Sequence, residues 1–237
     1  MKKLIVIPTY NEKKNISILL NQLIKRFNSS FKVLVIDDNS PDGTANEVLK
    51  YTKKYKFITL KVRKEKLGIG SAHKFGIRYA IKNKFKILIT MDSDGTHNPK
   101  YIKVFLKKID KYDLITTSRF KNKKSLKAWP LFRIVLTNIR HFIIRFFLDL
   151  TIDASGAFRC YNIENFKSKD LLDAKDNGYS FFWESIFLLH KKKYKIYEIP
   201  VDLPFRKLGS SKMRISDILN SLAFLFYYFF KRFFLKN

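Results

Sequence analysis

The sequence predicts an α/β fold with a mainly parallel sheet flanked by helices. Short apolar runs, of the kind that form strands buried on both faces, recur in the first half of the chain. They cover residues 4–7, 33–36, 87–90 and 114–117, with a weaker run at 58–62. Segments with apolar residues at helical spacing lie between these runs. Such alternation is typical of a parallel sheet, because a crossover helix leads from each parallel strand to the next.

The second half of the chain has a different pattern. Residues 129–148 are apolar with a basic stripe, residues 153–161 are small and polar, and residues 178–206 contain a helix followed by a strand-like run. A chain of 237 residues is long enough for one well-packed domain. We therefore predict one domain at residues 1–213, which includes an amphipathic helix at 129–148, and an apolar helix at 214–237.

The composition indicates an anionic partner. The chain has 48 basic and 20 acidic residues, a formal net charge of +28. Nucleic acid, an anionic membrane surface and phosphorylated substrates all fit such a charge. Much of the phenylalanine lies in basic segments near residues 129–148 and 218–234, and this mixture favours a membrane interface. The single cysteine, Cys160, excludes an internal disulfide and a cysteine zinc cluster.

Polar residues follow four of the predicted strands. They are Pro8 to Glu12, Asp37 to Ser40, Met91 to Asp94 and Ser118 to Phe120. Ligands bind outside the carboxyl ends of the strands in sheets of this class. We therefore expect these four segments to form one site.

Asp92 and Asp94 are the sharpest feature of that site. Two carboxylates one residue apart at a strand end can both reach one divalent cation, and oxygen ligands suit Mg²⁺ or Mn²⁺. The alternative is a plain turn, because Asp-Ser-Asp-Gly is also good turn chemistry.

Two further segments have both a binding and a structural interpretation. Asp38 is a candidate for holding the nucleoside, whereas Asp42 suits the turn that enters the next helix. The glycine-rich segment at 68–72 allows a close backbone approach to a ligand, but a plain turn is the better interpretation.

Seven segments identify a resemblance. They are PTYNE at 8–12, VIDDNSPDGT at 35–44, KLGIGSA at 66–72, MDSDGTHNP at 91–99, SRF at 118–120, SGAFRCY at 155–161 and EIPVDLPFRKLGSSKM at 198–213. In this order they resemble the polyprenyl-phosphate (dolichyl-phosphate) mannosyltransferases of the inverting GT-A glycosyltransferases, family 2. The resemblance covers residues 3–213 and implies a GT-A (nucleotide-diphospho-sugar transferase) catalytic domain there. It also implies transfer of a sugar, mannose from GDP-mannose, to a polyprenyl or dolichyl monophosphate with inversion.

The resemblance implies a role for individual residues. The donor site would comprise Pro8, Tyr10, Glu12, Ile36, Asp38, Asp92, Ser93, Asp94, Arg119, Arg206 and Lys212. Arg206 and Lys212 would belong to a mobile loop that closes over the donor. The cofactor would be Mg²⁺ or Mn²⁺, held by Asp92 and Asp94, with Thr96 at a position where the family often carries glutamine. Arg119, Arg133 and Thr137 would bind the acceptor phosphate, and Asp94, Arg119 and Arg133 would be the catalytic residues.

Two helices would meet the membrane. In this family a helix that matches residues 131–148 rests on the bilayer and presents the lipid phosphate; the alternative is an ordinary core helix. The C-terminal run at 218–230 is shorter than the roughly 20 apolar residues that a spanning helix needs. We expect an interfacial helix there, with a marginal span or a contact to a small membrane subunit as alternatives. The protein would be peripheral or monotopic at the cytoplasmic face of a membrane.

Three other functions remain open from the sequence. A sister transferase would use UDP-glucose or UDP-N-acetylglucosamine. A nucleic-acid-binding protein would fit the charge of +28, although the acidic strand ends would repel phosphate and argue for no nucleic acid. A non-catalytic membrane scaffold is the third.

Overall fold

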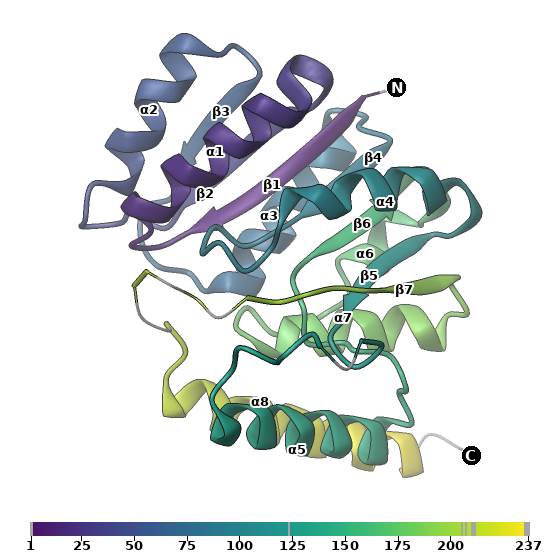
Figure 1. Cartoon of the computed structure of the whole chain (residues 1–237). Helices are drawn as coiled ribbons and strands as arrows, with labels where there is room; N and C mark the ends of the chain where they lie inside the picture. Colours follow the sequence, from purple (N-terminus) through teal and green to yellow (C-terminus); the bar gives the residue numbers. More distant parts are fainter. Residues whose placement is uncertain (1, 123, 205, 207, 210–211, 235–237) are drawn as a thin grey trace.

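The computed structural model describes residues 2–234 except 123, 205, 207, 210 and 211, and the side chains of residues 232–234 are not described. Figure 1 shows an α/β arrangement of seven strands and eight helices within those residues. The strands are β1 (Lys3–Thr9), β2 (Lys32–Asp37), β3 (Ile58–Val62), β4 (Ile87–Thr90), β5 (Leu114–Ser118), β6 (Arg159–Asn162) and β7 (Ile196–Pro200). The helices are α1 (Lys13–Phe27), α2 (Thr44–Lys54), α3 (Ile69–Lys82), α4 (Ile102–Lys108), α5 (Leu131–Leu148), α6 (Ser168–Leu171), α7 (Ser180–Lys191) and α8 (Ile215–Phe234).

The strands form one sheet in the order β3-β2-β1-β4-β6-β5-β7. Every neighbouring pair is parallel except those that involve β6, which runs antiparallel to β4 and β5. The predicted mainly parallel α/β fold is therefore confirmed. The last residues of the small polar segment at 153–161 belong to a strand that the sequence did not indicate, the buried β6. Arg159 and Asn162 gave that strand a polar pattern although both side chains are buried.

Both faces of the sheet are covered, which explains the continuously apolar strands. Ile5 and Ile7 point to one face and pack with the apolar residues of α1, α2 and α4. Leu4 and Val6 point to the other face and pack with α3, α6 and α7. The carboxyl ends of the parallel strands are consequently left free for a site.

Helices α5 and α8 lie side by side in a layer outside α7 (Figure 1). The Phe147 ring of α5 packs against Phe226 and Phe229 of α8, with centroids 5.4 and 4.8 Å apart. The Trp183 Nε1 atom of α7 donates to the Ser221 hydroxyl of α8 at 3.0 Å. These contacts fix the two helices to the sheet domain through α7.

Many large apolar side chains of α5 and α8 nevertheless remain exposed. Leu131 is 76% exposed and Phe146 66%. We call the following set the apolar surface: Leu131, Phe132, Val135, Leu136, Ile139, Phe142 and Phe146 of α5, with Ile215, Ile218, Leu219, Leu222, Phe226 and Phe230 of α8. Within the described part of the chain, neither these helices nor any other has the length and apolar character required to cross a bilayer.

Candidate active site

A cavity of about 250 Å³ opens at the carboxyl ends of β1 and β4. It brings together most of the predicted donor-site residues, namely Pro8, Tyr10, Glu12, Asp38, Asp92, Ser93, Asp94, Arg206 and Lys212. Two predicted donor residues do not line it. Ile36 is fully buried in the core, and Arg119 lies at a neighbouring cluster.

The register of β1 and β2 places the first acidic residues. Thr9 pairs with Asp37, and the Thr9 hydroxyl donates to Asp37 Oδ1 at 2.9 Å. Asp37 also accepts hydrogen bonds from the N–H and the hydroxyl of Ser40 at 2.9 and 2.6 Å. Both oxygens of its carboxylate therefore bond to the turn that follows β2 and to Thr9. Asp38, one residue later, is the one that lines the cavity.

Asp38 has a cationic partner that the sequence did not indicate. Arg63, just after β3, forms a buried ion pair with Asp38. The same guanidinium donates to the Ser71 hydroxyl at 2.8 Å and to the Gly68 carbonyl at 3.1 Å. Burial raises the pKa of Asp38, against the opposing bond and charge of Arg63. Arg63 thereby connects Asp38, the residue expected to contact the nucleoside, to the start of α3.

The glycine-rich entry of α3 serves packing rather than a phosphate cradle. A Cβ on Gly70 would lie 2.6 Å from Phe181 Cβ, and one on Gly68 would lie 2.4 Å from the Asn177 carbonyl oxygen. Gly68 also has φ of +91°, which other residues rarely adopt. The Ser71 N–H donates to the Asn177 carbonyl at 3.0 Å. The glycines therefore let segment 177–178 approach α3.

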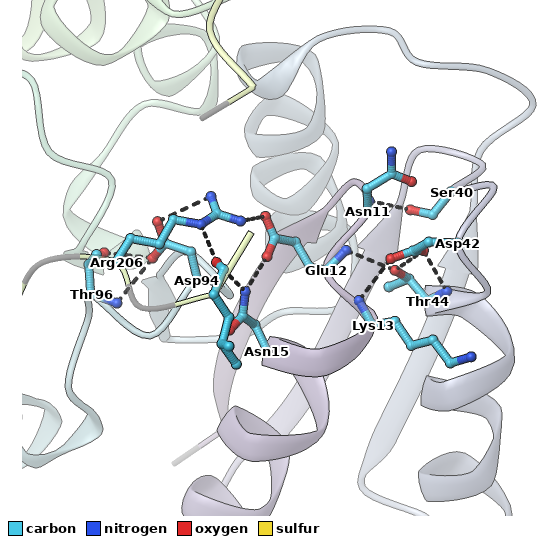
Figure 2. Close-up of polar contacts among 11 residues, drawn as sticks. Asn11, Glu12, Lys13, Asn15, Ser40, Asp42, Thr44, Asp94, Thr96 and Arg206 are labelled. Atoms are coloured by element: carbon cyan, nitrogen blue, oxygen red, sulfur yellow. Dashed lines mark hydrogen bonds and ion pairs between the residues drawn. The ribbon is translucent and has the colours of Figure 1, made fainter. Parts of the chain in front are cut away.

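Acidic side chains and one arginine meet at the mouth of the cavity, as Figure 2 shows for Glu12, Asp94 and Arg206. An Arg206 Nη2 atom lies 2.5 Å from Glu12 Oε1, and Nη1 lies 3.7 Å from Asp94 Oδ2. The second Glu12 oxygen accepts from the Asn15 amide at 2.7 Å. The Arg206 guanidinium thus lies between Glu12 and Asp94, close to where a metal ion bound by Asp94 would lie. Residues 207, 210 and 211 of the predicted lid lie outside the described residues.

Asp94 and Asp92 are each oriented by a neighbour in the same turn. Asp94 Oδ1 accepts the Thr96 N–H at 3.1 Å and the Thr96 hydroxyl at 2.6 Å. His97 Nδ1 accepts the Asp92 N–H at 2.9 Å, and its ring stacks on Phe158. Burial lowers the pKa of His97 to about 4, so this histidine is neutral at pH 7. Thr96 contacts the carboxylate here, which suits orienting Asp94; its role as a metal ligand stays a prediction.

The electrostatics of the cavity fit a divalent cation. Desolvation, followed by the charges of Asp94 and Glu12, raises the pKa of Asp92 to about 8, although 36% of its side chain is exposed. Asp94 and Glu12 thus place negative charge beside Asp92, which a bound cation would offset. Among the described residues, no three His, Cys, Asp or Glu side chains form a metal cluster. Asp92 and Asp94 alone suit a metal that takes its remaining ligands from substrate phosphates and water.

Arg119 belongs to a buried cluster that the sequence revealed only in part. Asp153 Oδ2 accepts the Arg119 N–H and Nε at 3.0 and 2.8 Å. Arg140 of α5 donates to the Ser155 hydroxyl at 2.9 Å, and that hydroxyl donates to Asp153 Oδ1 at 3.0 Å. Burial and the neighbouring Arg119 lower the pKa of Arg140 to about 10, which leaves it charged at pH 7. Arg119 therefore bonds the Asp153 carboxylate directly, whereas Arg140 reaches it through the Ser155 hydroxyl.

The other acceptor candidates lie on the same helix. Thr137 is buried one turn before Arg140. Arg133 lies a further turn away, and its guanidinium is 5.4 Å from the Trp129 ring centroid. Sequence spacing placed Arg140 on the same face as Arg133 and Thr137, but nothing in it singled out Arg140 as the partner of Arg119. Asp153 lies in the small polar segment and gave no signal.

Comparisons with known proteins show the family of the chain. Residues 4–195 match the model of the family described as glycosyl transferase family 2. The polyprenol monophosphomannose synthase of Mycolicibacterium smegmatis is 29% identical over 226 residues, 93% of this chain and 84% of that protein. The undecaprenyl-phosphate mannosyltransferase of Micrococcus luteus is 30% identical over 214 residues, 90% of this chain and 88% of that protein.

A solved structure supports the fold independently. The glucosyl-3-phosphoglycerate synthase of Mycobacterium tuberculosis, crystallised with UDP, aligns with a TM-score of 0.64 at 13% identity, over 95% of this chain and 79% of that chain. That likeness confirms the predicted GT-A fold. With the family match over most of the chain, it follows that this protein belongs to glycosyl transferase family 2.

Proposed function

We propose that this glycosyltransferase transfers mannose from GDP-mannose to a polyprenyl monophosphate, with inversion and with a divalent cation. The observation that carries the proposal is the pairing of an acidic cavity with an adjacent cluster of two arginines, the buried Arg119 and the half-buried Arg140. Relatives named as polyprenyl-phosphate mannose transferases match at 29% and 30% identity over most of this chain. Donor and acceptor would each bring a phosphate group to one of these two places.

The donor would occupy the cavity. Asp38 and Tyr10 would contact the nucleoside, and Asp92 and Asp94 would hold Mg²⁺ or Mn²⁺ against the diphosphate. When bound, this metal would neutralise the charge that develops on the leaving nucleoside diphosphate. Arg206 would exchange its contact with Glu12 for the diphosphate, since its guanidinium already lies at the cavity mouth.

The acceptor phosphate would meet Arg119 and Arg140, with Arg133 and Thr137 nearer the start of α5. Asp153 forms an ion pair with Arg119 alone, so the positive charge of the half-buried Arg140 is left to attract an anion. A phosphate monoester is already anionic at neutral pH and needs no strong general base. Rate enhancement would then come from positioning and charge neutralisation, and a single displacement inverts the anomeric centre.

The apolar surface would lie on the bilayer, so that the protein associates with the membrane peripherally. Seven exposed apolar residues of α5 fall on the helix that also carries Arg140. Lipid chains would contact these residues while the lipid phosphate reaches the arginines. We place this surface on the cytoplasmic face, where nucleotide sugars are available. A small membrane subunit that packs on α8 is an alternative occupant of part of it.

A donor screen tests the proposal. Purified protein would be incubated with undecaprenyl phosphate and tritiated GDP-mannose, UDP-glucose or UDP-N-acetylglucosamine, in Mg²⁺, Mn²⁺ or chelator. Lipid-extractable label from GDP-mannose with metal, absent with chelator, is the expected result. Label from a UDP-sugar instead would replace the donor. No label from any donor, with salt-sensitive retention of RNA on a filter, would refute the proposal.

A further inference from the structure

We propose that Glu184 of α7 and Tyr228 of α8 are positioning residues for the donor half of the site. Together they fix segment 174–179, which forms one wall of the cavity, and they join that wall to α8. The inference rests on the proposed function, because its readout is the binding of a nucleotide sugar.

Glu184 is a fully buried carboxyl group with donors from two directions. Its Oε1 atom accepts the Lys175 N–H at 2.8 Å and the Tyr228 hydroxyl at 2.5 Å. Its Oε2 atom accepts the Asp176 N–H at 2.9 Å. A buried carboxyl group of this kind is costly unless such donors satisfy it. Two of the three bonds therefore hold the backbone of segment 174–179 in place, and the third joins Glu184 to α8.

The position of that segment decides the shape of the cavity. Gly178 and Tyr179 line the cavity together with Gly68, against which this segment packs. The Asn177 carbonyl accepts the Ser71 N–H at 3.0 Å, and the contact is too close for a side chain on Gly68 or Gly70. A shift of a few tenths of an ångström in the segment would consequently change the start of α3, where Arg63 also holds Asp38.

Lys74 of α3 also bonds to segment 174–179. Its buried Nζ donates to the Lys175 carbonyl at 3.0 Å and to Asn177 Oδ1 at 3.1 Å. The segment is thus held from α3 on one side and from Glu184 on the other. Loss of the Glu184 side alone would let the segment move without detaching it.

Helix α8 is part of the same construction. Tyr228 is buried against Trp183 and Phe187 of α7, and Asp217 in the first turn of α8 lines the donor cavity. Five α8 residues beyond Asp217 belong to the apolar surface. The helix that would meet lipid therefore also forms a cavity wall, and Tyr228 joins it to Glu184. The hydroxyl of Tyr228 acts on the donor through Glu184 and segment 174–179, not by contact.

The experiment compares two neighbouring tyrosines. Tyr228→Phe removes only the hydroxyl that bonds Glu184. Tyr227→Phe is the matched control, since its hydroxyl contacts the exposed Lys175 Nζ at 3.3 Å. Dissociation constants for GDP-mannose and UDP-glucose with Mg²⁺ would be measured by calorimetry on the full chain in detergent. The KM for undecaprenyl phosphate would be measured in parallel.

Tyr228→Phe should weaken donor binding about three- to tenfold, because it leaves a buried acceptor atom of Glu184 with one hydrogen bond fewer. Glu184→Gln should weaken it about tenfold or more, because its amide N–H₂ would face a backbone donor. Tyr227→Phe should stay within about twofold of wild type, as expected of an exposed contact. The KM for the lipid should change little in every variant.

The outcomes separate this inference from the proposed function. Equal donor affinity of Tyr228→Phe and Tyr227→Phe, with donor binding intact in wild type, would overturn the inference alone. A lower melting temperature of Tyr228→Phe with unchanged donor affinity would also overturn it, since that is a structural role only. Wild-type protein that binds neither sugar nucleotide would overturn the proposed function and this inference with it.

Discussion

Asp153→Asn removes the carboxylate that pairs with the buried Arg119 and that Arg140 reaches through Ser155, while it keeps the shape of the side chain. Asp153 is 1% exposed, and Arg119 donates to it twice. Loss of one partner from a buried ion pair costs about 3–5 kcal/mol, because the other charge stays buried. Asparagine keeps one acceptor oxygen, so we expect the lower end, about 3 kcal/mol of unfolding free energy. For a chain of this size that lowers the Tm by about 6–12 °C.

Urea unfolding followed by circular dichroism at pH 7 measures this loss. Asp173→Asn is the matched control: Asp173 Oδ2 lies 2.6 Å from Lys192 Nζ, but its side chain is 48% exposed. An exposed pair contributes only about 0–1 kcal/mol. If the Asp153 and Asp173 variants lose equal stability, the Arg119–Asp153 pair is not desolvated and the proposed anion site loses its basis.

The pH dependence of the same variant gives a second check. Burial disfavours the charged form of Asp153, but the charges of Arg119 and Arg140 and the hydrogen bonds from the Arg119 N–H and the Ser155 hydroxyl outweigh it and lower the pKa of Asp153 below its ordinary value of 3.8. A lowered carboxyl pKa contributes stability above about 3.8 that is lost as pH falls through the folded-state value. The stability difference between wild type and Asp153→Asn should therefore be constant from pH 5 to 7 and narrow below pH 4.

Three further predictions concern the metal, the acceptor and a buried histidine. Asp94→Ala should abolish transfer and Mn²⁺ binding without lowering the Tm. In the contacts described, the Asp94 side chain bonds only to Thr96 of its own turn and to Arg206, so its loss removes little packing. Full turnover of this variant would refute the metal assignment. Arg140→Ala should raise the KM for polyprenyl phosphate about tenfold or more, as loss of a charge-assisted contact does, with the donor KM unchanged; Arg145→Ala, an exposed arginine on the same helix, is the control. His73 is buried between Phe181 and Phe182, and burial lowers its pKa to about 3. As the pH falls below about 6.5, His73 gains a proton in the unfolded state but not in the folded state, so the free energy of unfolding decreases. Between pH 7 and pH 5 the wild type should therefore lose about 2 kcal/mol more unfolding free energy than His73→Gln. Equal pH dependence of the unfolding free energy in the two proteins would contradict a buried neutral histidine.

The strands and the acidic strand ends could be predicted because local pattern determines them. Continuous apolar runs specify strands buried on both faces, and the parallel topology brings their ends together whatever the side chains are. Asp38, Asp92 and Asp94 therefore lie at one cavity, as predicted. Strand β6 was not predicted, because the charged residue Arg159 interrupts its apolar pattern. That side chain is buried, with its donors on the carbonyls of Ala154, Gly156 and Phe182 and on the Ser185 hydroxyl.

The partners of the site residues could not be predicted, because they depend on contacts across the fold. Arg63 lies 25 residues from Asp38, and Asp153 lies 34 residues from Arg119. In the sequence, Glu184 is one polar residue on an apolar helix. Only the fold shows that it accepts hydrogen bonds from the backbone N–H groups of Lys175 and Asp176. The glycines near Gly68 were ambiguous for the same reason, since only the fold reveals segment 177–178 against them. The membrane role of α5 and α8 stays a prediction.

The central claim is that an anionic phosphate at the Arg119–Arg140 cluster accepts mannose from a donor held at Asp92 and Asp94. The most direct measurement compares the rate of mannosyl transfer from GDP-mannose to undecaprenyl phosphate with the rate to undecaprenol, in the same vesicles with Mg²⁺. We expect transfer to the phosphate only, with a β-linked mannosyl phosphate as the product. Equal transfer to the free alcohol, or transfer to the phosphate that survives loss of both Arg119 and Arg140, would contradict the account.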